Sequence, residues 1–378
     1  MSRPTFAEIE LAAVRDNYRT LKSLLAPQVK VLGVVKADAY GHGAVPVART
    51  LEAAGIDMLA VALVEEGIEL RVAGIGRPIL VMGAIPADEI AAAMEYDLTP
   101  TIDDLATARE IESQAAARNR TVRVHLKIDT GMNRLGVRAE DTAAAAAAVA
   151  AMKHLVLEGA YTHLACADED GHAATPEQLD RFRRALDAMR AAGVRPALVH
   201  AANSSAAIAL AEARFDMVRP GLALYGIRPC PAARPLALRP ALTLKTRVVH
   251  LKHIRPGEGV SYGHKWVADR RSTLGVLPIG YADGYPRALY NGGMARVAGR
   301  LCPIRGVVCM DMLLVDLTEV PEPRVGLGAA LIEADHSSPI SAEALAKLCG
   351  TIPYEILTGI GRRVPRVYLS AESCPSRE

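Results

Sequence analysis

The sequence predicts an N-terminal (β/α)8 barrel followed by a mostly β domain, and three observations support this prediction. The chain has 378 residues, which is more than one ordinary domain usually contains. Short β-branched runs alternate with helical stretches from residue 29 to about residue 221. Beyond Arg228 the alternation stops, and short strand-like runs punctuated by Gly and Pro follow. We therefore place the barrel in residues 1–228, the β domain in residues 229–378, and expect residues 1–11 to pair with the β domain.

Eight runs in the first part are predicted strands. Most are uniformly apolar, as expected for parallel strands that are buried on both faces. They are Val31–Val35, Met58–Leu63, Ile79–Met82, Leu98–Ile102, Val122–Ile128, Leu157–Thr162, Leu198–His200 and Met217–Val218. Eight strand–helix units favour a closed barrel, and an open α/β sheet is the alternative.

The clearest helix is predicted between Thr175 and Gly193. Thr175 is the expected N-cap, Pro176 occupies the first helical position, and Gln178 completes a capping box. Gly193 is suited to a left-handed C-terminal cap.

The second part begins after a linker rich in Pro and Arg at residues 228–240. Its strand-like runs are Leu242–Ile254, Thr273–Pro278, Met294–Val297, Cys302–Val308, Met312–Asp316 and Ala329–Ile332. One helix is predicted at Ser341–Leu348. The N-terminal strand, Thr5–Ile9, is expected to pair with this part.

Composition argues against several classes of protein. The net charge is +2 and basic residues are scattered, so neither a nucleic-acid surface nor a polybasic membrane patch is indicated. The N-terminus lacks the pattern of a signal peptide. The cysteines form no CxxC pair, which argues against zinc or any other metal site and fits a reducing, cytoplasmic compartment; they are Cys166, Cys230, Cys302, Cys309, Cys349 and Cys374.

Reactive residues follow the predicted barrel strands, at the end where barrel enzymes place their chemistry. Lys36 follows the first strand directly, within VVKADAYGHG. A lysine buried at such a position has a lowered pKa and a nucleophilic amine, as a Schiff base with an aldehyde cofactor requires. The loop Tyr40–Gly43 after it is flexible and carries a hydroxyl, which suits a phosphate group. A surface lysine is the plain alternative.

The motif around Lys36 resembles the cofactor-lysine motif of the bacterial alanine racemases, which use pyridoxal 5'-phosphate (PLP). The resemblance continues in order along nearly the whole chain, through KIDTGMNRLG (127–136), YTHLACADE (161–169), HAANSSA (200–206), VRPGLALYG (218–226), GVSYGHKW (259–266), PIGYADGYPR (278–287), VCMDM (308–312), TIPYE (351–355) and RRVPR (362–366).

The resemblance implies an enzyme that interconverts L- and D-alanine, supplying D-alanine for peptidoglycan. Lys36 would hold PLP as an aldimine and act as the base on one face of the substrate, while Tyr262 would act on the other face. Arg219 would contact the pyridine nitrogen, which should stay unprotonated because a guanidinium does not give up its proton. Arg134 would contact the phenolic oxygen of PLP and the substrate carboxylate. His163 would bond to Arg219 or pack beside the ring.

The resemblance also assigns the remaining site residues. The cofactor phosphate would be bound by Tyr40, Ser204, the backbone amide of Gly221 and Tyr354, and Asn203 and Leu222 would also bind the cofactor. Lys127 is similar to a lysine that is often carbamylated in this family, and an ordinary pair with Asp129 is the alternative. The family forms head-to-tail homodimers with shared active sites, to which the neighbouring subunit would contribute Tyr262, Tyr281 and Met310.

One position departs from the family pattern. Val307 stands where the family usually has an arginine, which would pair in the access channel with the acid at Asp168. The proton-transfer residues are unaffected, but the geometry of the channel and the breadth of substrates are in doubt.

Three other readings remain open at this point. A broad-specificity or serine racemase would use the same Lys36 and Tyr262 and differ in the volume of its pocket. A related PLP decarboxylase would need an acid in place of Arg219. A PLP-binding homeostasis protein would be a single barrel, without the domain that carries Tyr262.

Overall fold

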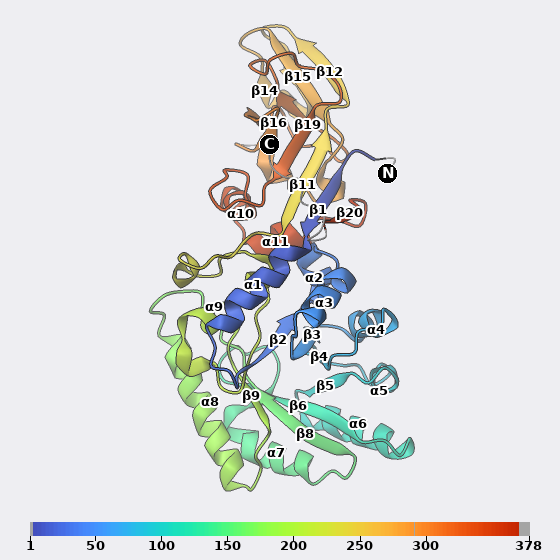
Figure 1. Ribbon diagram of the computed structural model, residues 1–378, viewed down its shortest axis with the longest axis vertical. Coiled ribbons are helices and arrows are strands. Elements are labelled where there is room, and N and C mark those ends of the chain that lie inside the picture. The colour runs from blue at the N-terminus through green and yellow to red at the C-terminus, as the bar shows by residue number, and fades with distance from the viewer. Residues whose placement is uncertain (1–2, 291, 370–378) are drawn as a thin grey trace. The chain divides into compact units, whose positions relative to one another are not determined.

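The computed structural model describes residues 3–290 and 292–369, so Cys374 lies outside the described residues. The chain divides into two compact units (Figure 1). One contains residues 14–39 and 44–238, and the other contains the described parts of 1–13, 40–43 and 239–378. No helix among the described residues is long and apolar enough to cross a membrane.

The first unit is a closed barrel of eight parallel strands. Neighbouring strands pair in the order β5-β4-β3-β2-β10-β9-β8-β6, and a pairing between β5 and β6 closes the ring. The prediction of a closed barrel is therefore confirmed against the open sheet. The bounds are β2 Lys30–Val34, β3 Met58–Val61, β4 Ile79–Val81, β5 Thr99–Ile102, β6 Val122–Asp129, β8 Leu155–Tyr161, β9 Leu198–His200 and β10 Met217–Val218. A short strand, β7 (Val137–Arg138), pairs with β6.

Helices cover the outside of the barrel strands (Figure 1), as the βα connections of a parallel barrel require. In chain order after α1 (Leu11–Ser23) they are α3 Ala44–Ala53, α4 Val64–Val72, α5 Ile90–Glu95, α6 Leu105–Ala117, α7 Thr142–Ala150, α8 Ala174–Ala191 and α9 Ser204–Ala209. Asp104 caps α6, because its carboxylate accepts a hydrogen bond from the Thr107 amide at 2.7 Å.

The predicted start of α8 is wrong. The helix begins at Ala174, and Thr175 is a buried helical residue whose hydroxyl oxygen has no hydrogen-bond partner among the described residues. Gln178 forms no capping box, since its side chain accepts from the Ala165 amide and donates to the His163 carbonyl, at 2.8 and 3.1 Å. It therefore fixes the segment after β8. The predicted end is confirmed: Gly193 follows the helix with φ of 82°.

The second unit is built around a six-stranded sheet in the order β17-β16-β19-β11-β1-β20. The N-terminal strand pairs antiparallel with β11, with Ile9 opposite Leu242. A three-stranded sheet, β12-β15-β18, and the hairpin β13-β14 complete the unit. The bounds are β1 Phe6–Glu10, β11 Leu242–Arg247, β12 His250–Ile254, β13 Gly259–Val260, β14 Trp266–Val267, β15 Ser272–Leu277, β16 Met294–Val297, β17 Arg300–Pro303, β18 Leu313–Asp316, β19 Gly328–Ile332 and β20 Arg366–Leu369.

Several features of this unit differ from the sequence prediction. The run Leu242–Ile254 is two strands in different sheets, separated at Val248 and Val249. Helix α11 (Pro353–Thr358) and strands β13, β14 and β20 were not predicted, and the predicted run Cys302–Val308 is a strand only as far as Pro303. Helix α10 (Ala342–Cys349) was predicted, and the Ser341 hydroxyl caps it by accepting from the Ala344 amide at 3.1 Å.

Candidate active site

Lys36 lies at the carboxyl end of β2, where the first barrel strand passes into α2 (Lys36–Gly41). Burial lowers the pKa of its amine, and the nearby charge of Arg134 lowers it further. A larger fraction of the amine is therefore neutral, and so nucleophilic, near neutral pH than in an exposed lysine.

A left-handed turn lies between Lys36 and the remainder of the predicted loop Tyr40–Gly43. Ala37, Asp38, Ala39 and Tyr40 have φ between 52° and 54°, so four consecutive residues with side chains adopt the left-handed helical conformation. This conformation costs roughly 1–2 kcal/mol per residue. Hydrogen bonds offset part of that cost at both ends, from the Ala37 amide to Glu66 at 2.6 Å and from the Ala44 amide to Asp38 at 2.7 Å. Such strain is typical of functional sites.

Four cationic side chains act on one partly buried histidine at the carboxyl end of the barrel. Burial, followed by the charges of Arg219, Arg134, Lys127 and Lys36, lowers the pKa of His163 to about 3. His163 is therefore neutral at neutral pH. The sequence had assigned all five residues to one site, and this electrostatic coupling indicates that they lie near one another. Such a concentration of positive charge is suited to an anionic ligand.

Arg219, at the end of β10, is only 3% exposed and is held from several sides. Its Nη2 donates to the carbonyls of Thr162 and Ala201 at 2.7 and 3.1 Å and lies 3.4 Å from His163 Nδ1. Its Nη1 lies 2.9 Å from His200 Nδ1. Burial lowers the pKa of Arg219 to about 10, so it remains a cation at neutral pH.

Lys127 lies inside the barrel on β6, with its Nζ 5.6 Å from the centre of the Tyr161 ring. Burial and then the charges of Arg134 and Arg219 lower its pKa to about 8, despite the opposing charges of Asp103 and Asp129. The Asp129 carboxylate accepts from the amides of Gly131 and Asn133 at 2.9 and 3.0 Å, which shapes the turn that leads to Arg134.

Backbone amides and a hydroxyl meet where β9 and β10 end. Ser204 Oγ accepts from the amides of Gly221 and Ala223, at 2.9 and 3.3 Å. With its acceptor positions used, the hydroxyl hydrogen is left to donate to an anion. Asn203 caps α9 by accepting from the Ala206 amide at 3.0 Å, and Leu222 begins the next helical turn, where amides lack partners within the turn. This donor set fits a phosphate group.

The second unit brings Tyr262, Tyr281 and Met310 to one region. The Tyr281 amide donates to Cys309 and the Ala282 amide to Met310, each at 3.0 Å. The segment that carries Tyr262 joins them through Ser261, whose Oγ donates to the Val307 carbonyl at 2.9 Å. Gly280 is needed for this approach, because a Cβ there would lie 2.2 Å from the Cys309 oxygen. All three predicted residues are exposed, and Tyr262 is 72% exposed.

Tyr40 and Tyr354 also belong to the second unit. Their ring centres are 5.7 Å apart, with the planes tilted by 43°. Gly41 has φ of 79°, and a Cβ there would lie 2.4 Å from the Leu357 carbonyl oxygen, so only glycine allows the backbone at residue 41 to approach α11 this closely.

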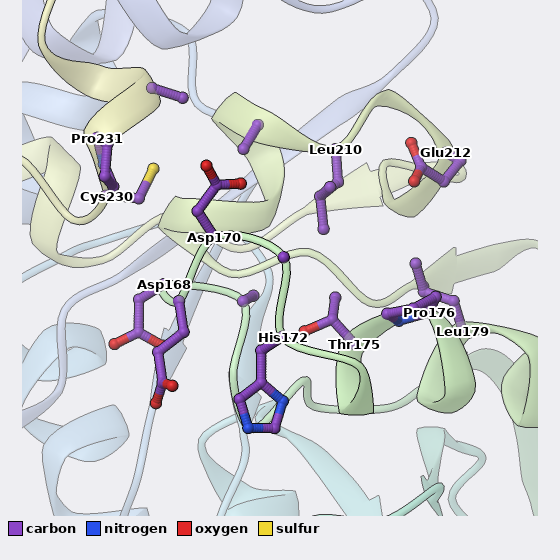
Figure 2. A pocket seen from close by; sticks show the side chains of 15 residues that line it. Asp168, Asp170, His172, Thr175, Pro176, Leu179, Leu210, Glu212, Cys230 and Pro231 are labelled. Atoms are coloured by element: carbon purple, nitrogen blue, oxygen red, sulfur yellow. The ribbon is translucent and has the colours of Figure 1, made fainter.

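Asp168 lines a cavity of about 290 Å³ in the barrel unit (Figure 2). The side chains of Asp170, Glu212 and Cys230 surround the same cavity, and the described residues that line it include no lysine or arginine. Val307 is buried in the other unit. The role of this pair of positions in substrate access therefore stays a prediction.

His200 follows a predicted barrel strand, but four residues that are linked with it were missed by the sequence analysis: Tyr161, Thr101, His125 and Glu158. The Tyr161 ring stacks on His200 with centres 4.8 Å apart and planes 5° apart. Tyr161 also hydrogen-bonds Thr101 at 2.9 Å. The available signal was polar residues inside apolar strands, as in VRVHLKID, since a buried histidine needs partners.

Comparison with known families identifies the protein class. The family model of the alanine racemase N-terminal domain matches residues 9–229, and that of the alanine racemase C-terminal domain matches residues 241–368. The combination of a parallel barrel, with a lysine at the end of its first strand, and this β domain places the protein in a class of two-domain isomerases. More particularly, the chain belongs to the alanine racemase family.

Curated relatives and solved structures agree with this assignment. The chain is 45% identical to an alanine racemase of Halothermothrix orenii over 97% of each chain. It matches the structure of an alanine racemase from a D-cycloserine-producing Streptomyces lavendulae at 41% identity and a TM-score of 0.93, over 98% of each chain. It also matches an alanine racemase of Clostridium difficile 630 in complex with cycloserine, at 37% identity and a TM-score of 0.91, over 99% of this chain and 97% of that one.

Proposed function

We propose that this chain interconverts L- and D-alanine with PLP as cofactor, by a two-base mechanism that uses Lys36 and Tyr262. The observation that carries the proposal is the set of four cations around His163, which includes both a lysine with a lowered pKa and a buried arginine. Such a site suits a phosphorylated cofactor and a substrate carboxylate together.

The residues present fit PLP. Lys36 supplies an amine for covalent attachment, while the Ser204 hydroxyl, the Asn203 side chain and the Leu222 amide supply donors for the phosphate. The Gly221 amide donates to Ser204 Oγ in this structure, so its bond to the phosphate stays a prediction. When bound, PLP withdraws electrons from the substrate Cα, so that its proton can be removed. The roles of Tyr40 and Tyr354 in holding the phosphate stay predictions.

Lys36 Nζ takes or returns the Cα proton on one face of the substrate, and Tyr262 Oη does so on the other. Arg134 binds the substrate carboxylate. Arg219 would place a positive charge at the cofactor ring, because its pKa of about 10 leaves it protonated at neutral pH. A cation at that position opposes ring protonation and so limits side reactions such as transamination and decarboxylation.

Tyr262, Tyr281 and Met310 serve the active site of a second copy of the chain in a homodimer. Their exposure supports this, because a group of exposed aromatic and methionine side chains is typical of an interface rather than of a free surface.

Racemisation of a panel of amino acids by the purified protein tests the proposed function. We expect L-alanine to be converted to a racemic mixture in the presence of PLP, with serine and larger amino acids converted at less than about a tenth of that rate, since one pocket contact is worth about 1–3 kcal/mol. Chiral chromatography measures both enantiomers. A protein that racemises serine as fast as alanine would instead be a broad-specificity racemase.

Carbamylation of Lys127 is a second expectation. The neutral Lys127 amine attacks CO2, an N–C bond forms, one proton is released, and a carbamate results. A pKa of about 8 leaves part of the amine neutral at neutral pH, and the cations Arg134 and Arg219 that lower it would stabilise the carbamate charge.

Protein prepared in 13C-bicarbonate should show a carbamate carbon signal by NMR. Lys127→Arg should lose this signal and lower kcat by about tenfold, because Arg134 would lose the anion that orients it. The control is Lys153→Arg on the exposed surface, which should change neither quantity. If wild-type protein in saturating 13C-bicarbonate gives no carbamate signal, Lys127 acts as an ordinary cation paired with Asp129.

A further inference from the structure

A chain of hydrogen bonds runs from Arg219 to a glutamate that the proposed mechanism does not use. His200 Nδ1 lies 2.9 Å from Arg219 Nη1, and His200 Nε2 lies 2.8 Å from His125 Nδ1. His125 Nε2 then lies 3.4 Å from Glu158 Oε2. Both histidines are fully buried, whereas the Glu158 side chain is 26% exposed and lies three residues before Tyr161 on β8.

The chemistry of the two ends fixes the direction of every bond in this chain. Arginine can only donate, so His200 Nδ1 must accept. A neutral imidazole has one N–H, so His200 Nε2 carries it and donates to His125 Nδ1. By the same rule His125 Nε2 donates to Glu158, whose carboxylate can only accept. Burial lowers the pKa of both histidines, which keeps them neutral.

Glu158 is maintained as an anion by its surroundings. The hydrogen bond from His125 lowers the pKa of Glu158, and the charges of Arg123 and Lys30 lower it further against the effect of burial. Arg123 lies 3.9 Å from the other carboxylate oxygen. The terminal acceptor of the chain is therefore permanent at neutral pH.

The fold provides space for the His125 ring. Gly159 lies opposite His125 in the β6–β8 register, directly after a register shift between Val124 and His125. A Cβ on Gly159 would lie 2.5 Å from His125 Nδ1, so any other residue at this position would displace the ring from its place beside His200. The histidine pair thus depends on a specific glycine and a local irregularity of the barrel.

We propose that Glu158 and His125 are positioning residues for Arg219: the carboxylate fixes the tautomers of His125 and His200, so that His200 presents an acceptor to the guanidinium. In the reverse tautomers, the His200 Nδ1–H would face an Arg219 N–H, donor against donor. Arg219 would then keep only the contacts of its Nη2 and would rotate. The consequence for the cofactor rests on the proposed function, in which Arg219 faces the pyridine ring.

The experiment compares Glu158→Leu, Glu158→Gln and wild-type holoenzyme by 15N NMR of labelled histidines, with His125→Gln used for assignment. Leucine removes the terminal acceptor, whereas glutamine keeps a weaker one. The matched control is Glu112→Gln, which neutralises another glutamate–histidine pair, 2.9 Å from His154 Nδ1, outside the chain. The absorbance of bound PLP and the values of kcat and KM are measured on the same samples.

In the wild type, both His125 and His200 should be Nε2–H tautomers. Glu158→Leu should populate the Nδ1–H tautomers, shift the absorbance maximum of the cofactor, and lower kcat by about tenfold with KM changed by less than about twofold. The tautomer populations, cofactor absorbance and kcat of Glu158→Gln should lie between those of the wild type and Glu158→Leu. The control Glu112→Gln should match the wild type. Partial recovery by glutamine separates the loss of the acceptor from general damage to the barrel.

An Nδ1–H tautomer of His200 in the wild type would overturn the proposal, as would unchanged tautomers in Glu158→Leu. Changed tautomers with an unchanged cofactor absorbance and an unchanged kcat would show that these hydrogen bonds do not position Arg219 for the cofactor. If the tautomers respond as expected but the wild type does not racemise alanine, the proposed function fails, while the proposed order of hydrogen bonds from Arg219 to Glu158 still holds.

Discussion

Lys36→Ala should lower racemisation of alanine by at least about 10^4-fold, because it removes both the attachment point of the cofactor and one of the two bases. Lys36 ends β2 and precedes a strained left-handed turn, so no other lysine can take its position without rearranging that turn. Borohydride treatment of the wild type should fix the cofactor to the peptide that contains Lys36, and the variant should show no such label.

The control for this variant is Lys153→Ala, an exposed lysine outside the site, which should keep full activity and the Lys36 label. A small primary amine added to Lys36→Ala should restore a fraction of the activity by entering the space that the side chain leaves. Rescue of this kind distinguishes a missing base from a misfolded barrel. Retention of more than about a tenth of the wild-type rate by the folded variant would contradict the role of Lys36.

The barrel could be predicted because its physics is local. Strands that are buried on both faces must be apolar along their whole length, so each appears as a distinct run between helical segments. All eight predicted runs overlap an observed strand, and Leu198–His200 and Met217–Val218 have the predicted bounds. The prediction fails at Leu242–Ile254, where one strand-like run serves two sheets. The change of partner at Val248 depends on tertiary contacts rather than on composition.

The start of α8 shows how tertiary structure overrides a local signal. Thr175 and Gln178 have the spacing of a capping box, but Gln178 bonds to backbone groups of the segment after β8 and Thr175 is buried inside the helix. The partners of Gln178 are 13 and 15 residues away in sequence, beyond the reach of a capping rule. Helix α11 was missed for a simpler reason, since six residues are too few to show helical periodicity.

The cationic residues of the site could be found from their motifs, whereas the residues that orient them could not. Lys36, Arg134 and Arg219 lie in motifs shared with a known family, and each has a direct chemical reason to be there. His125 and Glu158 act only through other residues, and their pairing depends on the β6–β8 register and on the space at Gly159. The left-handed turn after Lys36 was hidden as well, because three of its residues are alanine or aspartate rather than glycine.

Two inactive variants, Lys36→Ala and Tyr262→Phe, should restore about a quarter of the wild-type activity when their subunits are exchanged. In the proposed homodimer each site combines Lys36 of one chain with the tyrosine of the other, and the exposure of Tyr262 within its own chain supports this arrangement. Random exchange of equal amounts makes about half of the dimers mixed, and each mixed dimer has one complete site out of two. D-Alanine formation is measured after co-refolding, with a tag on one variant to confirm exchange.

The matched control exchanges the wild type with the double variant Lys36→Ala/Tyr262→Phe. If sites are shared, a mixed dimer has no complete site, and only the wild-type dimers, about a quarter of the total, remain active. If each site lies within one chain, every wild-type subunit keeps its activity, and about half of the full rate remains. For shared sites, each of the two mixtures should therefore keep about a quarter of the full activity. For sites within one chain, the mixture of the two single variants should be inactive, and the mixture of wild type with the double variant should keep about half. Incomplete exchange lowers the first rate and raises the second, toward the values expected for sites within one chain. The tag on one variant must therefore show complete exchange before the two rates are compared.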